Sequence, residues 1–248
     1  AALDWTLTNE RSQRAELRVR GALDRLDVTV TTDGPLSVEG NVEVRGLPDP
    51  DALAGRVALA GSLENWPGVD GSLRDVRLQA SGNRSDWQAQ LAAGLRWLEL
   101  PPVDADLALT GTAEAIEIGR GRLSALSGTV DVTGRAELGD APTATAAVRL
   151  SGLDFTPLYP EWPGQAAVSG GFDVDWDGSR LALDELQLRA PPAPLTVSGN
   201  AAFALPEHSL EVSLNWESFT WPPVTGDAKP LVASESGRLQ GSGTLEEW

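Results

Sequence analysis

Hydrophobic and polar residues alternate along most of the chain with a period of two. Within residues 36–45, Leu36, Val38, Val42 and Val44 occupy one phase, and polar side chains occupy the other. Side chains of a β-strand point alternately to its two faces, so this pattern predicts a strand with one half-buried face. The same alternation returns at residues 15–21, 56–61, 106–111, 128–134, 146–152, 194–200 and 208–216.

Turn and helix signals divide these runs. Asp-Gly pairs at 33–34, 70–71 and 177–178 predict hairpin turns between strands. Residues 49–56 could form one helical turn. Residues 84–100 fit either a helix or a strand, because both periods place apolar side chains on one face, and we favour the strand.

Glycines recur in the same phase as the apolar residues. The form apolar-x-apolar-x-Gly ends at Gly21, Gly40, Gly46, Gly61, Gly82, Gly111, Gly134, Gly152, Gly170, Gly178 and Gly199. A glycine at an inward position lets a strand bend or another backbone approach closely. The pattern therefore predicts a curled sheet. A closed sheet would be a barrel or sandwich, and an open one would be a gutter with an aliphatic floor; composition does not choose between them.

Three tryptophans precede proline, at Trp66, Trp162 and Trp221. Proline cannot continue a sheet ladder, and it keeps the preceding residue extended. We interpret these pairs as the ends of strand runs, where the indole covers an exposed end of the apolar interior.

Charge and composition exclude several classes of protein. The chain has 248 residues, 41% of them hydrophobic, and 36 acidic against 19 basic residues give a net charge of −17. Such a surface repels a phosphate backbone, so we expect no nucleic-acid partner. No cysteine is present to form a disulfide, a zinc cluster or a thiol nucleophile. No apolar run approaches the roughly 20 residues of a spanning helix.

We expect residues 1–248 to be a single repetitive β segment of a longer protein. A weak internal boundary is expected near 98–103, and any membrane anchor is expected outside this segment. We also expect no enzymatic activity. The sole histidine, His208, lies beside Glu207 and Ser209 between two strand patterns, where adjacent side chains point apart and cannot form a charge relay. We therefore expect a turn histidine.

One motif imitates a metal site. Asp173, Asp175, Asp177 and Gly178 match the opening of a calcium loop, but position twelve is Asp184 in place of the usual glutamate. Strand patterns flank the motif where a calcium loop has helices. We favour a hairpin whose aspartates face water, and we expect no metal and no cofactor.

Several runs together resemble a known family. They are residues 123–134, 150–170 and 194–200, and above all FTWPPVTG at 219–226 followed by SESGRLQGSGTLEEW at 234–248. In this order they are similar to the TamB and AsmA-like family of bridge-like lipid-transfer proteins. The resemblance implies an all-β body of antiparallel strands that form an elongated, open, U-shaped groove with a hydrophobic interior.

The resemblance also implies a function and a location. Such proteins are anchored in the inner membrane of Gram-negative bacteria and cross the periplasm. They are implicated in moving phospholipid between the two membranes and in outer-membrane protein assembly and secretion. The implied partners are phospholipid acyl chains and a TamA-like outer-membrane barrel, the latter through regions outside this segment.

Inward apolar residues are the candidates to line such a groove. Exposing a 16-carbon acyl chain to water costs on the order of 12 kcal/mol, at about 0.8 kcal/mol per methylene, and an aliphatic track removes most of that cost. The predicted lining is Leu36, Val38, Val42, Val44, Val57, Leu59, Leu107, Leu109, Val130, Val132, Val148, Leu150, Phe172, Val174, Trp176, Leu195, Val197, Phe203, Leu210, Val212 and Leu214.

Two alternatives remain open at this point. The same residues would form the core of an ordinary β-sandwich or barrel, acting as an interaction module or as a chaperone that binds unfolded strands. Nine tryptophans and many acidic residues also fit a carbohydrate-active or carbohydrate-binding protein.

Overall fold

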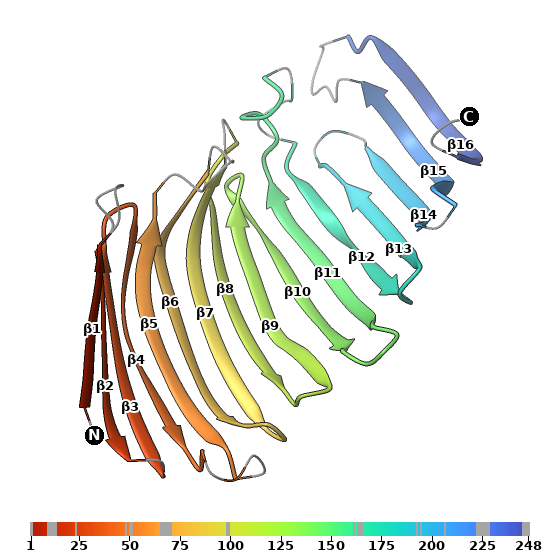
Figure 1. Cartoon of the computed structure of the whole chain (residues 1–248). Coiled ribbons are helices and arrows are strands. Elements are labelled where there is room, and N and C mark those ends of the chain that lie inside the picture. Colours follow the sequence, from red (N-terminus) through yellow and green to blue (C-terminus); the bar gives the residue numbers. More distant parts are fainter. Residues whose placement is uncertain are drawn as a thin grey trace. The chain divides into compact units, whose positions relative to one another are not determined.

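The chain is all-β in a computed structural model, shown in Figure 1. The structure describes residues 2–8, 14–22, 24–47, 49, 52–64, 71–97, 100–160, 162, 166–191, 193, 195–205, 207–221 and 229–244. Side chains of residues 2–8 lie outside this description. Within the described part, the molecule is built from sixteen β-strands joined by turns and short loops.

Contacts divide the chain into two compact units, Ala1–Gly121 (unit 1) and Arg122–Trp248 (unit 2). The strands of unit 1 are β1 (Ala2–Thr8), β2 (Arg14–Ala22), β3 (Arg25–Asp33), β4 (Leu36–Arg45), β5 (Ala54–Leu63), β6 (Gly71–Asn83), β7 (Trp87–Trp97) and β8 (Val103–Gly111). β9 (Ala115–Ala125) crosses the division. The strands of unit 2 are β10 (Gly128–Glu137), β11 (Thr143–Leu153), β12 (Val168–Trp176), β13 (Arg180–Arg189), β14 (Thr196–Ala204), β15 (Ser209–Trp221) and β16 (Val232–Thr244). In the segment 98–103, where a weak boundary is expected, residues 98 and 99 lie outside the described residues and Val103 begins β8.

Strands follow one another in the sheet in chain order, and the pairs with a defined register are antiparallel. Figure 1 shows this order in each unit, from β1 to β8 and from β10 to β16. Neither unit closes on itself among the described residues: β1 does not pair with β8, and β10 does not pair with β16. The prediction of an all-β, antiparallel and open sheet is confirmed, and the barrel alternative is excluded.

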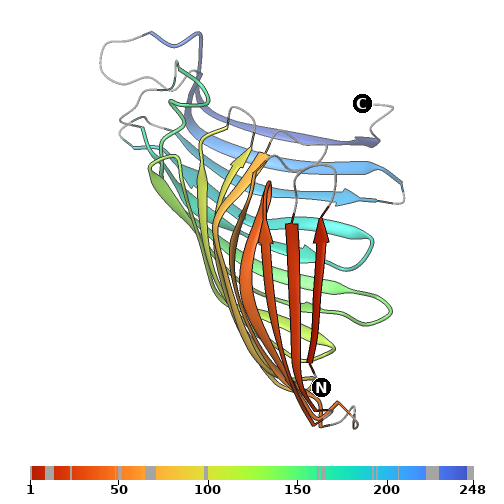
Figure 2. The same ribbon diagram turned by 60° about the vertical axis from the view of Figure 1, so that its left-hand side comes forward.

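The strands of unit 1 bend along their length, as Figure 2 shows for β4 to β7. Strong pairwise packing occurs only between strands that are neighbours in sequence, such as β5 with β6 and β6 with β7. Each unit is therefore a single curved layer over its described residues, without a second sheet facing it. The two-layer sandwich of the sequence analysis is also excluded.

Most local expectations are correct. Residues 87–97 form a strand, and the Asp-Gly turns at 33–34 and 177–178 join β3 to β4 and β12 to β13. Asp70 lies outside the described residues. The helical turn expected at 49–56 is wrong over 54–56, where β5 begins; the amide of Ala52 donates to the carbonyl of Asp49 (3.1 Å), and residues 50 and 51 lie outside the described residues. A helix cannot extend over residues 54–56 because these residues belong to β5.

Glycine on the apolar side permits close strand approach, as the repeat predicts. A Cβ added to Gly40 would lie 2.5 Å from the carbonyl oxygen of Ala58 on the next strand. At Gly170, φ is +154° and a Cβ would lie 1.9 Å from the carbonyl oxygen of Gln187. Both distances are well below van der Waals contact, so no other residue fits without moving the backbone.

No helix among the described residues has the length and apolar character needed to cross a bilayer.

Candidate functional site: an apolar sheet face

The register of unit 1 places apolar side chains in continuous rows across the strands. Residues paired directly in an antiparallel sheet point to the same face. One row crosses β3 to β8 through Val28, Val42, Val57, Ala80, Ala89 and Leu109. Two residues further along the strands, a parallel row runs through Val30, Gly40, Leu59, Leu78, Leu91 and Leu107. We call the surface that carries these rows the apolar face.

Unit 2 repeats the arrangement. A row crosses β10 to β15 through Val130, Leu150, Gly170, Leu188, Val197 and Trp216. The adjacent rows contain Val132 with Val148 and Phe172, and Val174 with Leu183, Ala201 and Val212. Unit 2 therefore has an apolar face of the same construction as unit 1.

The apolar face of unit 1 is not covered by any other described part of that unit. Its side chains are half-buried, because neighbours in the same sheet shield their flanks and leave their tips accessible. Ala89 is the only hydrophobic residue of unit 1 that is buried among those described. A sandwich core would bury most of these residues almost completely. The apolar surface is thus available to a ligand.

The structure brings together the residues expected to line a groove. Twenty of the 21 named positions lie on strands with their side chains on the apolar face of their own unit, and Leu195 lies just before β14. All are half-buried except Leu36, which is 40% exposed. Their placement on one face per unit follows from the register; that they contact lipid is still a prediction.

Sequence reasoning left out further members of the same rows. They are the apolar residues of β2, β3, β6, β7 and β13, including Val28, Val30, Leu78, Leu91 and Leu188. The alternation in β2 and β7 was visible in the sequence, so the period-two rule could have identified those positions. The apolar face is broader than the predicted list.

One end of the apolar face in unit 2 is covered by an aromatic cap, formed by Phe155, Tyr159 and Trp162 in the connection between β11 and β12. Trp162 is only 8% exposed, and its ring centroid lies 5.5 Å from that of Phe155. Its indole N–H donates to the carbonyl of Ala166 at 2.6 Å. A fixed indole with a satisfied N–H is a structural element of this connection.

The cap packs on the outermost apolar row of unit 2. Its buried cluster includes Leu153, Val168 and Ala190, and Val130, Leu150, Leu188 and Leu195 pack against it. The interpretation of the Trp-Pro pairs is therefore confirmed at Trp162, which closes an end of the apolar surface after a strand has finished.

The other two Trp-Pro pairs differ from this one. Trp221 is the last residue of β15, is 41% exposed, and contacts the ring of Tyr159 at a centroid distance of 5.4 Å. It ends a strand run as expected, but it is not buried. Trp66 lies outside the described residues.

The groups that imitate a catalytic or metal site are engaged in turns. His208 is exposed, has a φ of +48°, and its amide donates to the carbonyl of Leu205 at 3.3 Å, in the turn before β15. The expectation of a turn histidine is correct. Among the described residues, no cluster of three or more His, Cys, Asp or Glu side chains is arranged to hold a metal ion.

Asp177 closes the hairpin between β12 and β13. Its Oδ1 accepts hydrogen bonds from the amide of Ser179 (2.9 Å), the amide of Arg180 (2.7 Å) and the Ser179 hydroxyl (2.9 Å). The backbone bond from Ser179, followed by that from Arg180, lowers the pKa of Asp177 below its ordinary value. The Asp177 carboxylate stabilises the turn through these hydrogen bonds. Because its pKa is lowered, this stabilisation is present above the ordinary pKa of an aspartate and is lost as the pH falls and the carboxylate is protonated.

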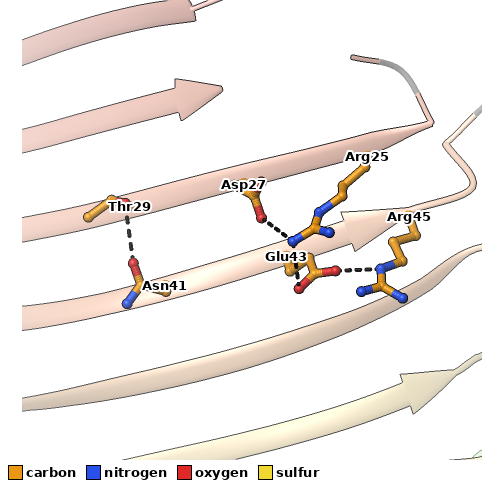
Figure 3. Close-up of polar contacts among 6 residues, drawn as sticks. All are labelled: Arg25, Asp27, Thr29, Asn41, Glu43 and Arg45. Atoms are coloured by element: carbon orange, nitrogen blue, oxygen red, sulfur yellow. Dashed lines mark hydrogen bonds and ion pairs between the residues drawn. The ribbon is translucent and has the colours of Figure 1, made fainter. Parts of the chain in front are cut away.

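The opposite surface, which we call the polar face, carries charged and hydrogen-bonding side chains. Figure 3 shows part of it on β3 and β4. Arg25 contacts both Asp27 and Glu43 at 3.5 Å, Glu43 also pairs with Arg45, and the Thr29 hydroxyl donates to the Asn41 side-chain oxygen at 3.2 Å. These pairs lie at the surface of the sheet, and each contributes little to stability.

Open antiparallel sheet with an apolar face and a polar face in each unit defines the class of protein. It is a repetitive β-sheet protein whose units each present rows of apolar side chains. The family model described as TamB, N-terminal domain, matches residues 2–191. The chain belongs to the TamB family. No curated protein and no solved structure gives a significant match to it.

Proposed function

We propose that the chain is one stretch of a lipid conduit, in which phospholipid acyl chains lie along the apolar faces of the two units. In this proposal it belongs to a periplasmic protein of a Gram-negative bacterium, anchored in the inner membrane. That protein moves phospholipid between the inner and outer membranes and supports outer-membrane protein assembly and secretion. Its proposed protein partner is a TamA-like outer-membrane barrel.

The observation that carries the proposal is the uncovered row of apolar side chains. In unit 1 the rows through Val57 and Leu59 cross six neighbouring strands, and all their residues are half-buried except Gly40 and Ala89, which are buried. An acyl chain laid on them leaves water, which recovers a large part of the roughly 12 kcal/mol that a free 16-carbon chain would cost in water. Packing within the sheet shields only the flanks of these side chains in unit 1, so their tips are available to an acyl chain.

The similarity of successive residues in the apolar rows favours movement of lipid along the surface over tight binding at one position. Apart from Gly40, successive positions are Val, Leu or Ala, so an acyl chain meets a similar surface at each strand it crosses. A deep pocket would hold the lipid at one place, whereas equivalent shallow sites let it slide between them. The role requires no catalytic group, and we propose that the segment is not an enzyme.

Lipid carried by the purified chain tests the proposal. After expression in a Gram-negative host and purification without detergent, native mass spectrometry is expected to show phospholipid bound to the chain. Unfolding in urea should release it, because the apolar rows exist only in the folded sheet. Protein that carries no phospholipid, and that takes up none from added vesicles, would contradict the proposed role.

A further inference from the structure

The polar face of unit 1 contains a hollow that the lipid function does not use. It has a volume of about 740 Å³ and extends over β3 to β9. On each strand from β3 to β8 it is lined by consecutive residues, such as 27–29 and 56–58. The middle residue of each run belongs to the apolar row through Val57, and the flanking residues point to the opposite surface. The hollow therefore lies on the polar face, with backbone as its floor.

Small residues among long polar ones create the depression. Ala58 on β5 stands between Asn41 and Gln79, Ala108 on β8 stands beside Gln90, and Gly119 on β9 has no side chain. The volume falls within the range of small-ligand sites in proteins. Its lining combines polar side chains with apolar atoms of the strands beneath them.

Neutral amides and hydroxyls are the main polar groups of this surface. Four side-chain amides line it, those of Asn41, Gln79, Gln88 and Gln90. Gln79 and Gln90 are direct cross-strand partners, so their amides project side by side from β6 and β7. Both are exposed, and within the described residues neither side chain has a hydrogen-bond partner. They contribute little to folding and are free to bind a ligand.

Hydroxyl groups complete the set. Thr29 lies opposite Asn41, Ser81 lies opposite Gln88, and Thr110 lies opposite Gln88 on the other side. The hydroxyl of Thr29 donates to Asn41 Oδ1 at 3.2 Å, which leaves the Asn41 amide N–H groups directed to other partners. Each amide and hydroxyl can both donate and accept, and this suits a ligand whose groups do the same.

The charges at the hollow argue against an ionic ligand. Asp27 and Glu43 line one end and are paired with Arg25, while Arg56 supplies one positive group nearby. An anion would meet a chain with a net charge of −17, and a cation would meet no group of three or more acidic residues arranged for metal binding in the described part of the chain. A neutral polyhydroxyl ligand avoids both problems.

The hollow is elongated across the strands, which indicates an extended ligand. It runs across neighbouring strands, which are spaced about 4.8 Å apart, close to the spacing of successive rings in an extended sugar chain. A glycan lying perpendicular to the strands meets a new pair of polar side chains at nearly every ring. We propose that the polar face of unit 1 binds an extended neutral glycan, on the surface opposite to the one that carries lipid.

Calorimetric titration with chitotetraose, a soluble tetramer of N-acetylglucosamine, tests this assignment. Saturable binding in the millimolar range is expected, because the contacts are hydrogen bonds at an exposed site. The affinity should change less than twofold between 50 and 500 mM NaCl, since no ion pair is formed. No saturable heat up to 10 mM sugar, or a loss of affinity in high salt, would overturn the proposal.

Amide substitutions locate the site. Gln79→Ala and Gln90→Ala should each weaken binding about fivefold, the effect of one lost hydrogen bond. Gln187→Ala is the matched control, an exposed glutamine on β13 of unit 2, and should leave the affinity unchanged. Equal weakening by Gln187→Ala, or tighter binding of an unstructured Gly-Ser peptide than of the glycan, would refute the assignment. Because the lipid surface is untouched, phospholipid content should be the same in all three variants.

Discussion

Val57→Asp is expected to slow phospholipid passage along the protein by roughly a hundredfold. Val57 lies in the middle of the central apolar row of unit 1, paired with Val42 and Ala80. Placing an aspartate against hydrocarbon costs about 2.5–3.5 kcal/mol. Since 1.36 kcal/mol in a barrier is a factor of ten in rate, that cost corresponds to about two orders of magnitude. In the lipid-free chain the carboxylate stays hydrated, so folding should be affected little.

The rate is measured as transfer of fluorescent phospholipid between donor and acceptor vesicles that the full-length protein connects. Ala60→Asp is the matched control, because Ala60 lies on the same strand with an exposed side chain on the polar face. It introduces the same charge three residues away and should leave transfer unchanged. Equal inhibition by the two variants would mean that net charge, and not the apolar face, controls the rate.

Trp162→Ala is expected to destabilise unit 2 by about 3–5 kcal/mol, the usual cost of truncating a buried tryptophan. The substitution removes the contact with Phe155, the hydrogen bond to Ala166, and the cover over Leu150 and Leu188. The melting temperature should fall by about 10 °C, followed by differential scanning calorimetry. Phospholipid content at a temperature where the variant is folded should change little.

Two further variants separate packing from lipid contact. Trp162→Phe keeps a ring against Phe155 and loses the N–H bond, so it should recover most of the stability. Trp97→Ala truncates a side chain that is 47% exposed at the end of β7, and should lower the melting temperature by much less. If Trp162→Ala instead emptied the protein of lipid without a change in melting, Trp162 would be a binding residue.

Period-two alternation predicted β2, β4, β5, β8, β10, β11, β14 and β15 and the faces of their side chains, whereas β9 lies outside the runs that it identified. In β4 the phase of Val38, Val42 and Val44 in the sequence is the phase of the apolar face in the structure. The pattern is reliable here because each strand has one face against water and one face of aliphatic residues, without a second layer to blur the difference. Whether the sheet closes was not visible, because an open and a closed sheet use the same alternation.

Bulges explain where simple alternation fails. In β13, Leu183 and Leu186 are three residues apart, so a strict period of two would put them on opposite faces. Glu185 has a φ of +52°, and the register against β14 shifts there, which returns Leu186 to the apolar face. The same device occurs at Asp75 in β6, also at +52°. A spacing of three residues, in place of two, between successive apolar residues is a weak sequence signal of such a bulge.

The cap and the polar hollow depend on tertiary structure. The tryptophan before proline indicated a strand end, but burial of Trp162 depends on the neighbouring strands that bring Val130, Leu188 and Leu195 beneath it. The hollow arises from side chains on seven strands, and its small residues are ordinary alanines and a glycine when read in sequence. Only the register places them beside one another.

The two faces of unit 1 separate two kinds of chemistry. Aliphatic rows stay uncovered on one side, and neutral amides with balanced charges occupy the other. Adjacent residues of a β-strand point in opposite directions, so each strand places its aliphatic side chains on one face and its polar side chains on the other. Substitutions one residue apart can therefore test each surface without disturbing the other.

Site-specific photo-crosslinking in living cells is the most direct measurement of where lipid lies. A benzoylphenylalanine residue would replace Leu78 or its neighbour Arg77 on β6, and Val148 or its neighbour Ala147 on β11. Leu78 and Val148 lie on the apolar face of their units, and Arg77 and Ala147 are exposed on the polar face. We expect phospholipid adducts at Leu78 and Val148 and none at Arg77 and Ala147. Adducts at all four positions alike, or at none, would contradict the assignment of the apolar face as the lipid track.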